Sequence, residues 1–258
     1  MGDSPVEVRR EGHLATIALA DPERRNVLDA AMATALREAA EALAAEGEVR
    51  CAILTGSGTV FAAGADVNEI GSAGAEENLV YNRQLRAAVN AVAALPMPTV
   101  AAVNGHAIGG GLELALACTL RVASTEAKLG TPEARLGIIP ATGGLARLPR
   151  LIGASRAARL LLTGDLVDGA EAERLGIVDA AVPAAQVADA ARALAERIAA
   201  AAPLSTRAIV ATLREDAGPI ADANLRSEER LARLLASADR REGAAAFLER
   251  REPSFQGH

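Results

Sequence analysis

A glycine-rich turn followed closely by a glutamate is the first place where this sequence suggests chemistry. Gly109, Gly110 and Gly111 run into a predicted helix, so bare backbone amides are presented at the positive end of the helix dipole. Because glycine has no side chain, a ligand can approach these amides closely, and they would stabilise an oxygen that gains negative charge. Glu113 follows one helical turn after Gly110, so its carboxylate can reach the same pocket and handle protons there.

A second glutamate stands at another predicted helix start. Thr131 suits an N-cap and Pro132 suits the first helical position, which makes Glu133 a first-turn residue. A third segment, 61–66, is a loop of small residues from which a further backbone amide can project.

Each of these segments has a simpler structural interpretation. The glycines can serve only to let a helix pack closely, and acids are favoured in first helical turns whether or not they do chemistry. Taken together, however, the three segments predict an oxyanion site flanked by two carboxylates.

The elements that position these segments alternate between strands and helices. After the opening hairpin, the recurring strands are apolar rather than alternating, which predicts a sheet that is covered on both faces or wound into a spiral. Turn and cap residues divide the first half of the chain into a hairpin followed by alternating helices and strands. The expected elements are a hairpin at Val6–Leu19, a helix at Leu28–Ala45, a strand at Val49–Leu54, a loop at Phe61–Asp66, a helix at Asn78–Ala94, a strand at Thr99–Val103, a helix beginning near Leu112 and a strand at Leu120–Ala123.

After Gly153 the sequence is mostly helical, with prolines separating the segments. Helical spacing is found in Arg156–Leu162, Gly169–Leu175, Val187–Ala201, Leu204–Leu213 and Leu225–Ala236. We therefore place a domain boundary near residue 200, between a core at 1–200 and a helical region at 201–258.

Composition excludes several classes of function. Half of the 258 residues are hydrophobic, while aromatic residues make up only 2%, which argues against stacking on single-stranded nucleic acid. The net charge is −6, and Lys128 is the only lysine, so any phosphate clamp must be built largely from arginines. The N-terminus has no signal-peptide pattern and the chain has no long uncharged apolar run, which predicts a cytoplasmic protein without a membrane span.

Other site motifs are absent from the sequence. The glycines fit neither a dinucleotide fingerprint nor a phosphate loop, and there is no serine-hydrolase elbow. Cys51 and Cys118 lie in apolar runs and are interpreted as buried small hydrophobes. His106 has no metal-ligand spacing around it and is interpreted as structural or pocket-lining, so no metal site is predicted.

The order of these segments resembles the crotonase family of enoyl-CoA hydratases and isomerases. The likeness runs from about Val6 to His258 and rests on FAAGAD, AAVNGHAIGGGLELALAC, LGTPEARLGIIPATGG, LTGD, RLGIVD and DRREGAAAFLERREPSF, in that order. The resemblance implies an α/β fold in which residues 1–200 form a crotonase-like spiral of ββα units that binds acyl-CoA. It further implies that the helical region at 201–258 makes trimer contacts, with two trimers commonly forming a hexamer.

The resemblance is strongest to the hydratases, lyases that add water across the 2,3 double bond of a 2-trans-enoyl-CoA in fatty acid metabolism. It implies that the amides of Ala65 and Gly110 hold the thioester oxygen, that Glu113 activates water and that Glu133 delivers a proton to C2. Which glutamate performs which step stays open. Relatives that shift a double bond commonly keep only the acid matching Glu133, so the presence of both acids favours hydration.

The resemblance also implies a set of residues that bind the substrate and its coenzyme A, with no separate cofactor. They are Arg24, Arg25, Val27, Ala63, Asp66, Val67, Gly109, Gly111, Pro132 and Ala141. The chain departs from the family pattern where Ala141 replaces a usual glycine, where Thr119 replaces a frequent Asp, and where Asn68 replaces the Lys of some relatives. These departures affect what can be predicted about the substrate, but they do not affect the resemblance to the family.

The sequence is also compatible with two functions other than that of a hydratase. One is another reaction of the same family, either double-bond isomerisation or dehydration of a specialised acyl-CoA. The other is an RNA-binding relative without activity, against which the acidic charge and the two acids argue. The expected partners are an acyl-CoA thioester and further copies of the chain, with no nucleic acid and no membrane.

Overall fold

The computed structural model describes residues 4–66, 74–214, 238–249, 251 and 253–258. Six of its strands form one sheet in which the first pair is the predicted hairpin and is antiparallel, while all further pairs are parallel. In spatial order the strands are β1 (Val6–Glu11), β2 (Leu14–Leu19), β3 (Cys51–Gly56), β5 (Thr99–Val103), β7 (Leu120–Ser124) and β10 (Ala180–Val182).

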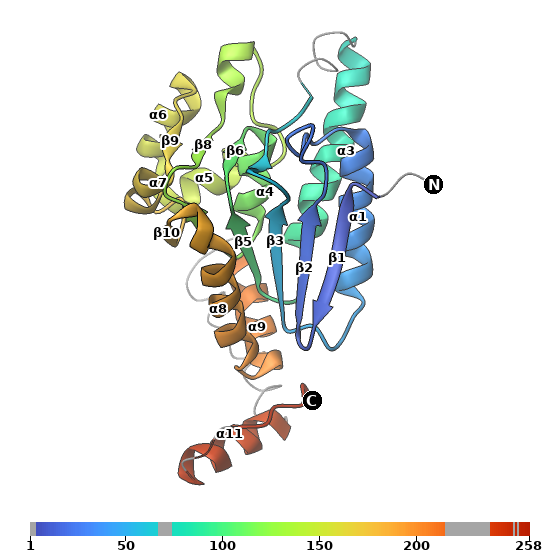
Figure 1. Cartoon of the computed structure of the whole chain (residues 1–258), viewed down its shortest axis with the longest axis vertical. Coiled ribbons are helices and arrows are strands. Elements are labelled where there is room, and N and C mark those ends of the chain that lie inside the picture. Colours follow the sequence, from blue (N-terminus) through green and yellow to red (C-terminus); the bar gives the residue numbers. More distant parts are fainter. Residues whose placement is uncertain (1–3, 67–73, 215–237, 250, 252) are drawn as a thin grey trace.

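A smaller four-stranded sheet lies beyond the ends of these strands (Figure 1). Its strands are β4 (Val60–Ala62), β6 (His106–Ile108), β8 (Lys128–Gly130) and β9 (Val167–Asp168). Strands β3, β5 and β7 of the large sheet are each followed directly by a strand of the small sheet, and the chain then returns through a helix or a helical turn. This repetition is the predicted spiral of ββα units, and it gathers the turns after β4, β6 and β8 on one side of the molecule.

The helices cover the sheets and connect successive strands. Helix α1 begins after Asp29, whose side chain accepts a hydrogen bond from the amide of Met32 and so caps the first turn. The α-helices are α1 (Ala30–Ala44), α3 (Ala75–Ala93), α4 (Gly110–Ala117), α5 (Gly144–Ile152), α6 (Ala154–Thr163), α7 (Gly169–Leu175), α8 (Val187–Ala199), α9 (Pro203–Arg214) and α11 (Ala238–Glu249), and the 3₁₀ helices are η1 (Pro132–Leu136) and η2 (Ala184–Gln186).

The central strands are largely apolar because both faces of the large sheet are covered. On β3, Cys51 and Ile53 pack with residues of α8, whereas Ala52 and Leu54 belong to the larger core on the other face. A strand that is buried on both sides has few positions for polar residues, which explains the long apolar runs. Arg121 of β7 is buried as well, and it donates to the carbonyl oxygens of Cys118 and Ile177.

The C-terminal helices contact the segment that leads into strand β3 of the large sheet. Arg207 of α9 donates hydrogen bonds to the carbonyl oxygens of Gly47 and Val49, and Arg50 donates to the carbonyl oxygens of Ala199 and Phe255. Only residues 200–202 separate α8 from α9. The boundary near residue 200 stays a prediction.

Some local features differ from the sequence predictions. The predicted loop at 61–66 begins inside strand β4, and the helix predicted near Leu112 already starts at Gly110. Thr131 does not cap η1 with its side chain, because its buried hydroxyl has no hydrogen-bond partner in the part of the chain that the structure describes. The predicted helix at 225–236 lies outside the described residues.

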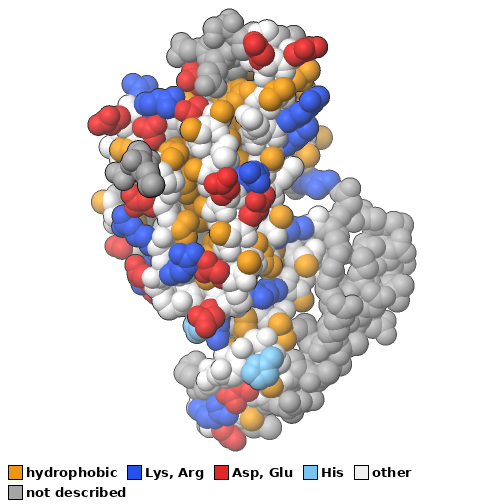
Figure 2. Space-filling model, turned by 90° about the vertical axis from the view of Figure 1, so that its right-hand side faces the viewer, with side chains coloured by type: hydrophobic (Ala, Val, Ile, Leu, Met, Phe, Trp, Pro, Cys, Tyr) orange, Lys and Arg blue, Asp and Glu red, His pale blue; other side chains and the backbone are white. Residues whose placement is uncertain are grey.

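Acidic side chains and arginines are interspersed on the surface. On the face shown in Figure 2, red and blue side chains lie next to one another. Ion pairs such as Arg37 with Glu41 within α1, and Arg10 with Glu46, are examples of this mixture. Within the described parts of the chain, no helix is both long enough and apolar enough to cross a membrane.

Candidate active site

The turns after β4, β6 and β8 meet around a cavity of about 690 Å³. Its wall is mostly apolar, with a few polar groups that converge on one region, which is the usual composition of a small-molecule site. Eight of the residues proposed from the sequence line it: Ala63, Ala65, Gly109, Gly110, Glu113, Pro132, Glu133 and Ala141.

Two backbone amides meet on one side of the cavity. A methyl group on Gly110 would lie 3.7 Å from the Ala65 nitrogen, and one on Gly64 would lie 3.4 Å from the Gly110 nitrogen. Within the described residues, neither the Ala65 amide nor the Gly110 amide donates to a protein acceptor. Gly110 is the first residue of α4, so its N–H belongs to the unsatisfied donors of a helix start. Together the two amides form a pair of donors for an oxygen of a ligand.

Gly109 must be glycine for two reasons. Its backbone has a φ of 54°, which side chains rarely tolerate, and a methyl group there would lie 2.9 Å from Oε1 of Glu133. The turn that presents the Gly110 amide therefore also makes room for the second acid.

Asn26 supports the segment that carries Ala65, and sequence reasoning missed it. This fully buried residue has a φ of 52° and donates to the carbonyl oxygens of Ser57, Val60 and Phe61. An asparagine tolerates positive φ better than most residues, and its amide satisfies buried carbonyls that would otherwise be unpaired. The polar Asn between Arg25 and Val27 is the signal that could have found it.

Tyr81 of α3 braces the same segment from the other side. Its hydroxyl lies 2.5 Å from the carbonyl oxygen of Leu28 and accepts a hydrogen bond of 3.0 Å from the amide of Asp66, the residue after Ala65. The single tyrosine of the chain thereby links α3, the segment before α1 and the loop after β4.

Glu113 is the buried acid of the cavity, with 2% of its surface exposed. Its Oε1 accepts hydrogen bonds from the amides of Thr142 (3.0 Å) and Gly144 (2.7 Å), and its Oε2 accepts one from the Thr142 hydroxyl (2.6 Å). The carboxylate is therefore fixed by the start of α5. Sequence reasoning missed Thr142 and Gly144, because they lie 29 and 31 residues from Glu113 along the chain.

Glu133 on η1 has a different environment. Its Oε2 is buried and has no hydrogen-bond partner in the described structure. Burial raises the pKa of Glu133 to about 7, its own backbone N–H works against this rise, and the nearby charge of Glu113 adds to it. Near neutral pH this side chain can therefore both hold and release a proton.

The remaining proposed residues lie beside the cavity without lining it. Arg24 pairs with Asp29 at 2.6 Å and with Asp21 and Asp66 at 3.5 Å, and Gly111 packs against the backbone of β4. The carbonyl of Arg25 accepts a hydrogen bond from the Ala63 amide, and Val27 forms a β-bridge with Gly64. These contacts tie residues 24–28 to the loop after β4. Val67 lies outside the described residues.

The cysteines and His106 lie outside the cavity lining. Both cysteines are buried, as predicted, and burial raises the pKa of Cys51 to about 12 and that of Cys118 to about 11, which disfavours the thiolate forms. His106 is exposed, and its Nδ1 accepts a hydrogen bond from the Lys128 amide, which gives it a structural role.

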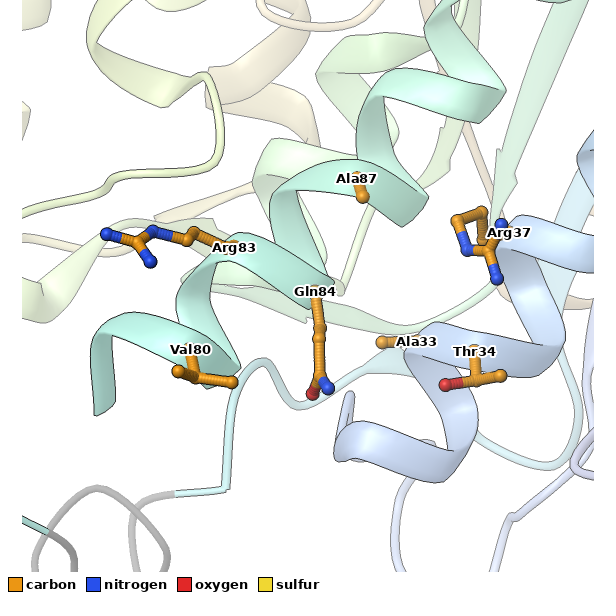
Figure 3. Close-up of a pocket in the computed structure, with 7 residues that line it drawn as sticks. All are labelled: Ala33, Thr34, Arg37, Val80, Arg83, Gln84 and Ala87. Carbon is orange, nitrogen blue, oxygen red and sulfur yellow. The ribbon is translucent and has the colours of Figure 1, made fainter. Parts of the chain in front are cut away.

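A second hollow of about 360 Å³ lies between α1 and α3 (Figure 3). Its lining consists of Ala33, Thr34, Arg37, Val80, Arg83, Gln84 and Ala87. Among these lining residues there is no carboxylate and no helix-start amide. The larger cavity, where the two acids and the two amides converge, is therefore the candidate active site.

Comparison with known proteins identifies the family. The sequence profile of the family described as "Enoyl-CoA hydratase/isomerase" matches residues 9–258. A putative enoyl-CoA hydratase from Thermus thermophilus is 41% identical, with 97% of this chain and 100% of the relative covered. A 2,3-dehydroadipyl-CoA hydratase from Escherichia coli is 37% identical, with 98% of this chain and 99% of the relative covered.

Solved structures agree with the fold described above. The crystal structure of an enoyl-CoA hydratase from Bacillus anthracis superposes with a TM-score of 0.96 at 34% identity, covering 98% of this chain and 100% of the other. One from Geobacillus kaustophilus gives a TM-score of 0.92 at 39% identity, covering 98% of each chain. The chain therefore belongs to the enoyl-CoA hydratase/isomerase family, the crotonase family, and its fold is the crotonase spiral.

Proposed function

We propose that the protein hydrates 2-trans-enoyl-CoA thioesters to 3-hydroxyacyl-CoA. The observation that carries this proposal is that two glutamates and two unpaired backbone amides line one cavity. Oxygen from water bonds to C3, a proton is added at C2, and the double bond becomes a single bond. Such an addition needs a stabilised oxyanion, a base for the water and an acid for C2, and the cavity has a group for each.

In this mechanism the amides of Ala65 and Gly110 donate to the thioester oxygen as it gains negative charge. Removing one oxyanion donor costs about 100- to 1,000-fold in rate in enzymes of known mechanism. Neither donor depends on a side chain, so point substitution cannot remove them cleanly.

We assign the base to Glu113 and the acid to Glu133. Both oxygens of Glu113 accept hydrogen bonds, which orients this carboxylate as an acceptor for water. The pKa of Glu133, raised to about 7 chiefly by burial, allows it to carry the proton that C2 receives. After each turnover the proton taken by Glu113 must return to Glu133 directly or through solvent.

The decisive test is the loss of the conjugated enoyl-thioester absorbance when purified protein is mixed with crotonyl-CoA. We expect rapid bleaching with 3-hydroxybutyryl-CoA as the product. If crotonyl-CoA is left unchanged while a 3-enoyl-CoA is converted to its 2-enoyl isomer, the protein is an isomerase and the hydratase proposal is wrong.

We propose no cofactor beyond the coenzyme A of the substrate, because the amide pair supplies the charge stabilisation that a metal would otherwise give. The expected result is full activity after dialysis against EDTA. Loss of activity that returns with a divalent metal would contradict this. The predicted cytoplasmic location stays a prediction.

We further propose a homotrimer or a hexamer of two trimers. Leu145 and Leu151 of α5, Leu162 of α6 and Leu166 after it are all at least 41% exposed, and α5 packs on α6. Several large apolar side chains on adjacent elements indicate a contact surface. Light scattering should give a mass three or six times the 26.3 kDa of one chain. A monomer at micromolar concentration would contradict this proposal.

A further inference from the structure

Thr142 makes two of the three hydrogen bonds that hold Glu113. Its amide donates to Oε1 at 3.0 Å and its hydroxyl donates to Oε2 at 2.6 Å. The amide contact depends only on the backbone, so almost any residue at this position could supply it. The hydroxyl contact requires Thr or Ser.

The hydrogen bonds leave Glu113 with little free acceptor capacity. A carboxylate has about four acceptor positions, two on each oxygen. Oε1 already accepts from the amides of Thr142 and Gly144, whereas among the described residues Oε2 accepts only from the Thr142 hydroxyl. One position on Oε2 therefore remains for a further donor such as water.

We propose that Thr142 is a positioning residue whose hydroxyl occupies one side of Glu113 Oε2 and so leaves a single direction from which the attacking water can bind. This inference rests on the proposed hydration reaction. Thr142 does not exchange a proton with the substrate, because its hydroxyl proton is directed at Glu113. Its effect is on the placement of the water relative to C3.

The surroundings hold Thr142 in place for this role. Thr142 and Glu113 are each 2% exposed, so neither side chain has room to swing into solvent. The carbonyl of Thr142 accepts a hydrogen bond of 3.1 Å from Arg147, whose other terminal nitrogen donates to Asn90 Oδ1 at 3.3 Å. The clamp on Glu113 is therefore anchored through α5 to α3.

Thr142→Val tests the proposal, because valine keeps the shape and the amide but loses the hydroxyl. We expect kcat for crotonyl-CoA to fall by about 10- to 100-fold, the cost of a misplaced reactant, with KM changed less than about twofold. Thr142→Ser restores the hydroxyl and should bring kcat back to within about threefold of the wild type. Serine fits where threonine does, so this variant keeps the test valid if the valine variant folds poorly.

Thr131→Val is a matched control. Thr131 is also buried, and its hydroxyl has no hydrogen-bond partner among the residues that the structure describes, so valine removes no described hydrogen bond there. We expect this variant to keep the wild-type kcat and KM. A large loss in Thr131→Val would show that burying a new methyl group, rather than losing the hydroxyl, explains the Thr142→Val result, and would overturn the inference.

The outcomes separate the two proposals. A wild-type protein that does not hydrate crotonyl-CoA or longer enoyl-CoA thioesters refutes the proposed function itself. With an active wild type, an unchanged kcat in Thr142→Val overturns the positioning role. A raised KM at constant kcat overturns it as well, because the hydroxyl would then serve substrate binding. Failure of Thr142→Ser to recover activity has the same meaning.

Discussion

The cavity has two walls that differ in how their acids are held. On the inner wall, Glu113 extends from α4, is 2% exposed and accepts three hydrogen bonds from Thr142 and Gly144. On the outer wall, Glu133 sits on a 3₁₀ helix of five residues, and its buried Oε2 has no hydrogen-bond partner among the described residues. The same side-chain type is thus fixed through both oxygens in one wall, whereas in the other wall one oxygen has no partner.

This difference indicates how one site can hold a base and an acid at the same pH. Hydrogen-bond donors orient Glu113 as an acceptor, whereas burial without a partner raises the pKa of Glu133 to about 7. The inner wall thus fixes the orientation of Glu113, whereas the outer wall favours the protonated form of Glu133. Substitutions in the two walls should therefore have different effects.

The largest expected effect is on the inner wall. Glu113→Gln keeps the shape and can still accept from the amides of Thr142 and Gly144, but it cannot take a proton from water. We expect kcat/KM for crotonyl-CoA to fall by about 100- to 10,000-fold, with the fold retained. The exposed Glu126 provides the control, since Glu126→Gln should behave like the wild type. Turnover of Glu113→Gln near the wild-type rate would rule out the two-acid mechanism.

The second effect is on the outer wall and appears in the pH dependence. The proposed acid must be protonated, and the pKa of Glu133 is raised to about 7. We therefore expect kcat/KM to fall about tenfold for each pH unit above this value. A pH profile measured with crotonyl-CoA checks this. A rate that stays flat up to about pH 9 would mean that Glu133 does not deliver the proton.

The same pKa predicts a smaller effect on stability. Because the pKa of Glu133 rises from its ordinary 4.5 to about 7 on folding, its ionised form is disfavoured in the folded state. The contribution of Glu133 to the free energy of unfolding is therefore complete below pH 4.5 and is lost as the pH rises to about 7. Glu133→Gln has no ionisable group at this position and does not lose this stability. From about pH 5 to about pH 8, the melting temperature of Glu133→Gln should therefore rise by a few degrees relative to that of the wild type.

Thermal unfolding of both proteins at the two pH values measures this gain. Glu126→Gln again serves as the control, because an exposed acid should show no such change. An equal difference between Glu133→Gln and the wild type at both pH values would mean that the carboxyl of Glu133 is solvated in the folded protein.

The features that could be predicted from the sequence are those with long or specific patterns. The strand at Thr99–Val103 and the helix at Gly169–Leu175 have the predicted bounds, because proline and glycine delimit them sharply. The glycine turn before Gly110 and the acids Glu113 and Glu133 could be found from residue type and spacing, and the structure gathers them on one cavity.

The features that could not be predicted depend on contacts between distant segments. Strands β6, β8 and β9 are only two or three residues long, too short for alternation to be read. Thr142 lies 29 residues from Glu113, so no local pattern reveals their hydrogen bond. Helix α5 begins with glycine and contains Pro149, which both oppose a helix prediction.

The smallest expected effect concerns the acyl chain at the mouth of the cavity. Leu79 (56% exposed), Leu136 (53%) and Ile139 (64%) line the cavity and still face solvent, which is costly for large apolar side chains unless a ligand covers them. An acyl chain long enough to reach this rim would remove apolar surface from water, at about 0.8 kcal/mol for each buried methylene.

Ile139→Ala should therefore lower kcat/KM for a ten-carbon enoyl-CoA by about three- to tenfold and leave the value for crotonyl-CoA nearly unchanged. The side chain is exposed, so the melting temperature should stay the same. Val80→Ala is the control, because Val80 is 51% exposed and does not line this cavity. An equal loss on short and long substrates would place Ile139 near the reacting carbons rather than at the end of the acyl chain, and the apolar rim would then belong to catalysis instead of chain-length preference.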